Sequence, residues 1–127
     1  MSDRTKRLKQ LAGVQARIHQ LHQARHATLM AQAQAAQMEA EEIGRRSYEE
    51  GSLSNLFPEL YARRVGDALR RRDEKLAAAA VEARDAATAK ARADKITEAY
   101  KTARSQEERQ TEDRERLEGI EQRLSRS

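Results

Sequence analysis

The chain has 127 residues, of which 36% are charged, 38% hydrophobic and only 3% aromatic. This length allows one domain, and the hydrophobic fraction, much of it alanine, is too small to fill a broad globular core. The net charge of +4 is the difference between 25 basic and 21 acidic residues, which indicates a surface of mixed, paired charges.

High charge with few aromatic residues is also typical of disorder. Against disorder, the commonest residues are Ala, Arg, Glu, Lys, Gln and Leu, which are the strongest helix formers. Long helices paired along a narrow seam therefore fit the composition best. The chain contains no cysteine, which excludes disulfides and thiolate chemistry. The longest apolar run, 76–81, is too short to cross a bilayer, and residues 1–7 do not resemble a secretory signal, so we expect a cytoplasmic protein.

The first helix is predicted over residues 2–48. Its apolar side chains follow the 3-4 spacing of a coiled-coil seam, in two stretches: Leu11, Val14, Ile18 and Leu21, then Ala33, Ala36, Ala40 and Ile43. Between the stretches the seam passes from Arg25 to Leu29 with a skip, which predicts a stutter.

A turn is predicted over residues 49–57. Gly51 suits the left-handed conformation that ends a helix, Ser52 or Ser54 can cap the next helix, and Pro58 suits its first turn. The tip is rich in bulky residues, which we expect to pack mostly on Ile43 and Tyr48, with an exposed apolar patch for a partner as the alternative. These residues are Leu53, Leu56, Phe57, Leu60 and Tyr61.

The second helix is predicted over residues 58–124. Its expected seam slips register near Lys90, and the alanine-rich stretch 77–93 favours close approach of a partner helix. The expected seam residues are Val65, Leu69, Leu76, Ala79, Ala83, Ala86, Ala93, Ile96, Tyr100 and Ala103.

Folding the chain near residue 53 pairs large seam residues with small ones. Ala36 then faces Leu69, and Ala40 faces Val65, an interdigitation that a parallel dimer would lose. We therefore predict an all-α fold, an antiparallel two-helix coiled-coil hairpin with a longer second helix, as a single domain over residues 1–127.

In this hairpin the segment 105–127 has no partner within the chain. Leu117, Ile120 and Leu124 lie on one helical face there, among Glu/Arg pairs that stabilise an isolated helix only weakly. Two interpretations stay open: the end is mobile, or these apolar residues dock on another protein.

The sequence offers no site for catalysis or for a cofactor. The five glycines are isolated, so there is no phosphate-binding loop, and a two-helix hairpin has no pocket in which to shift a pKa. His19, His22 and His26 have a spacing at which imidazoles can share a zinc ion, but we expect them on the flank of the seam, facing water, and predict no metal site.

A basic patch follows the turn, and we expect it to be salt-bridged helix surface. Its alternative role is to hold phosphate or an acidic protein surface. Because no aromatic residues lie among its arginines, it offers no base-stacking platform, and a protein partner is favoured over nucleic acid. The patch consists of Arg63, Arg64, Arg70, Arg71 and Arg72.

The chain resembles the stalk protein of the flagellar and type III secretion export apparatus, the FliJ/YscO group. The likeness is one of architecture: a small, charged, cysteine-free hairpin with a longer second helix that is rich in Arg and Ala, ending in the charged stretch 107–117. The resemblance implies a non-enzymatic stalk that inserts the open end of the hairpin into the ring of the export ATPase. It also implies contacts with the export gate and escort chaperones, and a position peripheral to the inner face of the membrane.

Carried onto this chain, the implied ATPase-facing part is Leu8, Leu11 and the segment 105–127, within which we single out Arg114, Leu117, Ile120, Arg123 and Leu124. The alternative function is a generic coiled-coil adaptor or chaperone that grips a client protein through the tip, followed by a nucleic-acid-binding hairpin that uses the basic patch. None of these functions involves a small-molecule substrate.

Overall fold

The computed structural model describes residues 1–49 and 51–126. Helix α1 spans Asp3–Ser47, the short 3-10 helix η1 spans Leu53–Asn55, and helix α2 spans Pro58–Arg126. No strand occurs in the described part of the chain. The chain divides into two compact units: the turn unit, His19–Ala87, and the terminal unit, which combines Met1–Ile18 with Thr88–Ser127.

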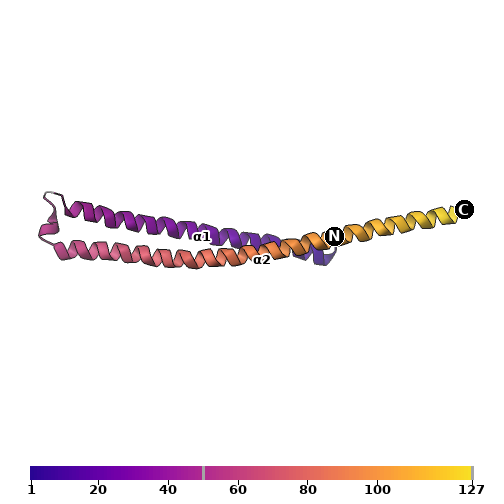
Figure 1. Ribbon diagram of the computed structural model, residues 1–127, viewed down its shortest axis with the longest axis horizontal. Coiled ribbons are helices and arrows are strands. Elements are labelled where there is room, and N and C mark those ends of the chain that lie inside the picture. Colours follow the sequence, from indigo (N-terminus) through magenta and orange to yellow (C-terminus); the bar gives the residue numbers. More distant parts are fainter. Residues whose placement is uncertain (50, 127) are drawn as a thin grey trace. The chain divides into compact units, whose positions relative to one another are not determined.

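In the turn unit, α1 and α2 lie side by side and are joined at the turn (Figure 1). The contacts between them pair rising residue numbers in α1 with falling numbers in α2. His19 contacts Ala86, His22 contacts Glu82, and Gln37 contacts Arg72. Within this unit the two helices therefore run in opposite directions and form a helical hairpin.

Side chains of serine hold the turn between the helices. Ser54 donates a hydrogen bond of 2.6 Å to the carbonyl oxygen of Ser47, the last residue of α1, while the Ser52 hydroxyl accepts one of 3.1 Å from the Ser54 amide. Gly51 has φ 77°, which confirms the left-handed conformation expected there. Pro58 is the first residue of α2, where its missing N–H leaves no helical bond unmade. Residue 50 of the predicted turn lies outside the described residues.

The buried line of α1 in the turn unit keeps one heptad register throughout. Alanines at its centre are the most buried, with Ala33 3% exposed and Ala36 6% exposed. The predicted stutter between residues 25 and 29 is wrong, because the 3-4 spacing continues through the histidines instead. Half-buried or buried on this line are His19, His22, His26, Leu29, Ala33, Ala36, Ala40, Ile43 and Ser47.

Helix α2 has an equally regular line of buried and half-buried residues. Ala68 is fully buried and Ala79 is 1% exposed, so small side chains let the two backbones approach closely. The line includes two half-buried cations and one half-buried carboxylate, and it leaves Leu76 41% exposed, contrary to expectation. Its members in the turn unit are Tyr61, Val65, Ala68, Arg72, Lys75, Ala79, Glu82 and Ala86.

The terminal unit has a seam with the same spacing. On α1 it comprises Thr5, Leu8, Ala12 and Gln15, and on α2 it comprises Ala89, Ala93, Ile96, Tyr100, Ala103 and Glu107. Ala89 is buried and its neighbours on this line follow at 3-4 spacing, so the predicted register slip near Lys90 is wrong.

The apolar residues expected to form the first part of the seam of α1 lie one position away from the observed seam. Leu11, Val14 and Leu21 are 49%, 47% and 48% exposed, although their spacing is that of a seam. The reason is register. A line extended backward from Ala33 at 3-4 spacing reaches His26, His22 and His19, and a pair of helices keeps one continuous seam in preference to following each local apolar cluster.

Neither described helix contains a stretch both long and apolar enough to cross a membrane.

Candidate functional site

The C-terminal part of α2 presents a long exposed helical surface in the terminal unit. From residue 108 to 126 all described residues are exposed except Gly119, which is intermediate. In Figure 1 this part of α2, drawn in yellow, continues past the N-terminus. An isolated helix of this kind is stabilised only by its own backbone and by neighbouring side-chain pairs, so its surface is available to a partner.

Glu107 connects α2 to the start of α1. Its Oε1 accepts hydrogen bonds from the Ser2 amide at 2.9 Å and from the Thr5 hydroxyl at 2.6 Å. Thr5 is 1% exposed, and its own amide donates to the Ser2 hydroxyl at 3.2 Å, which caps the start of α1. The expectation that 105–127 lacks any partner within the chain is therefore corrected, because Glu107 contacts the start of α1. Residue 127 lies outside the described residues.

These hydrogen bonds to the Ser2 and Thr5 side chains and to the Ser2 amide lower the pKa of Glu107 from its usual 4.5 to about 2. A carboxyl group whose pKa is lower in the folded state than in the unfolded state stabilises the folded state at pH values above its unfolded-state pKa. We expect that stabilisation to be complete above pH 4.5 and to be lost as the pH falls toward 2. The melting temperature of the wild type should therefore exceed that of Glu107→Gln at pH 6, with the difference shrinking progressively below pH 4.5.

The matched control for this experiment is Glu115→Gln, a carboxylate on the exposed part of α2. Its melting temperature should follow the wild type across the whole pH range. A constant difference between wild type and Glu107→Gln at every pH would show that the Glu107 carboxylate does not hold the N-terminus of α1.

The exposed C-terminal part of α2, residues 108–126, carries an apolar stripe among charges. Leu117, Ile120 and Leu124 are 60%, 50% and 70% exposed and follow each other at 3-4 spacing. The residues 108–126 include six acidic and five basic side chains, some paired along the helix, such as Arg116 with Glu112 and Asp113 at 3.8 Å. Arg114 and Arg123 are exposed on the same stretch. Gly119 leaves an open notch beside Ile120, because nothing lies within 4 Å of where its Cβ would be.

The other two residues assigned to the open end, Leu8 and Leu11, differ in burial. Leu8 is half-buried in the seam of the terminal unit, where it packs between the helices, and Leu11 is 49% exposed. Only Leu11 is thus available to a partner.

The tip of the hairpin is a second exposed apolar surface. Leu53, Leu56, Phe57 and Leu60 are 57%, 72%, 53% and 43% exposed. Of the five residues expected to pack mostly on Ile43 and Tyr48, Tyr61 is half-buried and lines a depression with both. The expectation is wrong for the other four, which are exposed, and Tyr48 is itself 92% exposed. We call the five exposed residues, Tyr48, Leu53, Leu56, Phe57 and Leu60, the tip patch.

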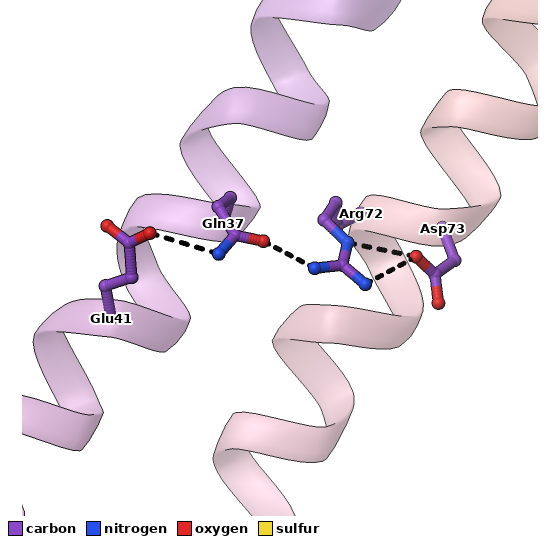
Figure 2. Close-up of polar contacts among 4 residues, drawn as sticks. All are labelled: Gln37, Glu41, Arg72 and Asp73. Atoms are coloured by element: carbon purple, nitrogen blue, oxygen red, sulfur yellow. Dashed lines mark hydrogen bonds and ion pairs between the residues drawn. The ribbon is translucent and has the colours of Figure 1, made fainter.

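The arginines of the basic patch fall into two groups. Arg70 pairs with Asp67 at 3.0 Å and Arg71 with Glu39 across the hairpin at 2.8 Å. Arg72 donates to Gln37 at 2.5 Å and to Asp73 at 2.8 and 2.9 Å, in a chain of contacts that ends at Glu41 (Figure 2). The carboxylates paired with these three arginines offset the positive charge that would attract a phosphate group.

Arg63 and Arg64 are both exposed, at the end of α2 that lies next to the turn. Arg63 lines a shallow depression together with Leu56, Phe57 and Leu60. Glu59 lines the same depression, so the border of the tip patch carries both a basic and an acidic side chain.

The three histidines lie in the seam and not on its flank, which corrects the expectation that they face water. All three are half-buried. The Nδ1 of His19 donates to the carbonyl oxygen of Ala86 at 3.0 Å, and the Nδ1 of His22 donates to Glu82 Oε2 at 2.5 Å. Asp85 lies close enough to His22 and Glu82 for their ligand atoms to fall within 4.8 Å of one another.

Sequence reasoning did not single out Glu82, Asp85 or Glu107. The signal that finds Glu82 and Glu107 is the heptad register: a strict 3-4 count from Ala68 reaches both, although neither is apolar. Asp85 follows from Glu82, because residues three apart share a helical face.

No protein-family model, no curated protein and no solved structure matches this chain.

Proposed function

We propose that this chain is a non-enzymatic stalk or adaptor of a flagellar or type III protein-export ATPase complex, which couples the ATPase ring to the export gate. In this proposal the molecule is an antiparallel coiled-coil hairpin with a longer second helix, and the C-terminal part of α2 docks on the ATPase. One observation carries it: the apolar stripe Leu117, Ile120 and Leu124, whose members are 60%, 50% and 70% exposed on the C-terminal part of α2. The architectural resemblance to the export stalk proteins supplies the identity of the partner.

The chemistry of this segment suits reversible docking. A helix with an apolar stripe binds by laying that stripe into a groove of its partner. The nearly balanced acidic and basic side chains around the stripe would make salt-sensitive contacts at the rim of such a groove, where charges govern the rate of association and its specificity more than its strength. The seam, in contrast, stiffens the hairpin through regular helix pairing, as a shaft or spacer requires.

The test is to end the chain after Glu107 and to measure binding and ATP hydrolysis with the export ATPase of the same organism. We expect binding to weaken at least about tenfold, because three exposed apolar side chains are removed from the interface. Far-UV circular dichroism should show that the remaining hairpin stays folded, since the cut keeps the Glu107 contacts.

Point variants separate the stripe from the helix that carries it. Leu117→Ser with Leu124→Ser should reproduce the loss, whereas Gln110→Ser with Gln122→Ser, two exposed polar positions on the same helix, should not. Unchanged binding and unchanged hydrolysis after the truncation would show that this end of the chain is not the ATPase-facing one.

The exposed tip patch favours a second candidate function, a coiled-coil adaptor or chaperone that binds a client protein through its tip. Exposed apolar clusters of this kind mark sites of protein interaction. Leu56→Ser with Phe57→Ser should then abolish client binding, while truncation after Glu107 leaves it intact. Leu76→Ser, on an α2 residue that is 41% exposed outside the tip, is the matched control. The opposite pattern, loss on truncation and tolerance at the tip, favours the stalk.

A further inference from the structure

We propose that the turn unit holds a divalent transition-metal ion of the zinc type between its two helices, at His22, Glu82 and Asp85. The donor atoms of these three side chains lie within 4.8 Å of one another. His22 comes from α1 and the two carboxylates come from α2, so an ion at this point would link the helices directly. The inference does not depend on the proposed function.

The donor set has the chemistry of a zinc site. One imidazole nitrogen and two carboxylate oxygens are common ligands of Zn²⁺, with bonds of roughly 2.0–2.2 Å that place neighbouring ligand atoms about 3.3 Å apart. The separation of 2.5 Å between His22 Nδ1 and Glu82 Oε2 and the limit of 4.8 Å for the set bracket that value. Small side-chain rotations therefore suffice to form the site, and water completes the coordination.

The placement of Asp85 distinguishes this cluster from a simple ion pair. A hydrogen bond to Glu82 accounts for the position of His22, and the side chains of both residues are only 19% exposed. Asp85 adds a second carboxylate beside Glu82 on the same helical face, three residues further along α2. Two carboxylates in one place repel each other, and a bound cation removes that repulsion.

The imidazole decides which class of cation fits best. Nitrogen ligands suit zinc, cobalt, nickel and copper, whereas magnesium and calcium prefer sites made of oxygen alone. Binding at His22 Nδ1 requires the neutral imidazole with a free lone pair on that nitrogen, so an ion that takes the place of the hydrogen bond to Glu82 selects the tautomer whose proton lies on Nε2.

The experiment uses the full chain, freed of metal by chelation, and titrates it with Zn²⁺ in a calorimeter and with Co²⁺ by visible absorption. We expect saturable binding of one ion per chain and a rise in melting temperature with added Zn²⁺, because the ion binds the folded hairpin across both helices. Asp85→Asn, Glu82→Gln and His22→Gln should each weaken binding by about tenfold or more. Asp85 is exposed, so its variant tests the site without disturbing the seam.

Two controls make the result specific. His26→Gln removes the histidine four residues from His22 along α1, one of the two that could share an ion with it, and Asp94→Asn removes an exposed carboxylate elsewhere on α2. Both variants should leave the affinity within about twofold of the wild type. Absence of saturable Zn²⁺ binding overturns the proposal. So does an equal loss in His26→Gln and His22→Gln, which would place the ion on α1 alone, and so does Mg²⁺ binding of equal affinity.

Discussion

Ala68→Glu is expected to lower the free energy of unfolding of the hairpin by about 3 kcal/mol or more. Ala68 is the most buried residue of α2, with no exposed surface, at a seam position where small side chains bring the two helices together. A glutamate there forces the helices apart and buries a charge without a partner. Urea denaturation followed by far-UV circular dichroism measures the change.

The control for this variant is Ala77→Glu. Ala77 is exposed on the same helix, and glutamate is a good helix former, so its unfolding free energy should stay within about 0.5 kcal/mol of the wild type. Equal unfolding midpoints for the two variants would mean that Ala68 does not lie between the helices.

The double variant His19→Leu with His26→Leu is expected to raise the free energy of unfolding by about 1 kcal/mol. Both histidines are half-buried at seam positions, and a fully buried leucine contributes roughly 1.5–3 kcal/mol, so each half-buried leucine should gain about 1 kcal/mol. Loss of the hydrogen bond from His19 to the carbonyl oxygen of Ala86 offsets about 1 kcal/mol of that gain. His22 is kept, which preserves its hydrogen bond to Glu82.

The same leucines at Gln20 and Gln23, which are exposed on the same part of α1, should give no such gain. This comparison tests the register directly. If the histidines faced water, as their sequence context suggested, both pairs of substitutions would have the same small effect on the denaturation midpoint.

These two experiments concern a seam whose polar residues have a specific arrangement. Polar side chains at seam positions stabilise a coiled coil less than leucine does, but they restrict its register and its choice of partner. His22 with Glu82, and Gln37 with Arg72, form hydrogen bonds across the hairpin that a shift by one heptad would break. The pairing of α1 with α2 of the same chain is thus favoured over pairing with unrelated helices.

The surfaces available to partners are apart from this seam. The stripe Leu117, Ile120 and Leu124 belongs to the terminal unit, and the tip patch belongs to the turn unit. Because the variants proposed for one surface do not touch the other, the stalk and the tip-binding adaptor can be tested independently in the same protein.

The sequence predicted a helical hairpin because the signals for it are local. Helix propensity accumulates over many residues, and Gly51, Ser52 and Pro58 each favour a turn through their own backbone or side-chain chemistry. The apolar stripe near the C-terminus was also predictable from the sequence, since it requires only the 3-4 spacing of three apolar residues.

Sequence reasoning assigned the seam of the first helix correctly from Ala33 to Ile43, but it assigned register and burial incorrectly nearer the N-terminus. Following apolar residues alone selected Leu11, Val14 and Leu21 for the seam, and the structure leaves each of them about half exposed. An apolar residue one position off the seam is adjacent to it on the helix, so composition cannot distinguish the two lines. The distinction comes from continuity over the whole helix pair.

By itself, the amino-acid sequence determined that this chain forms long helices, where they reverse direction, and which residues beyond the turn could serve as an apolar stripe, because each of these depends on residues close together in the chain. The tertiary structure alone decided that histidines and a glutamate occupy the seam, that Glu107 holds the start of α1, and that the tip patch is exposed. The physical reason is that close approach along one line of alanines fixes the register for every other residue, polar ones included.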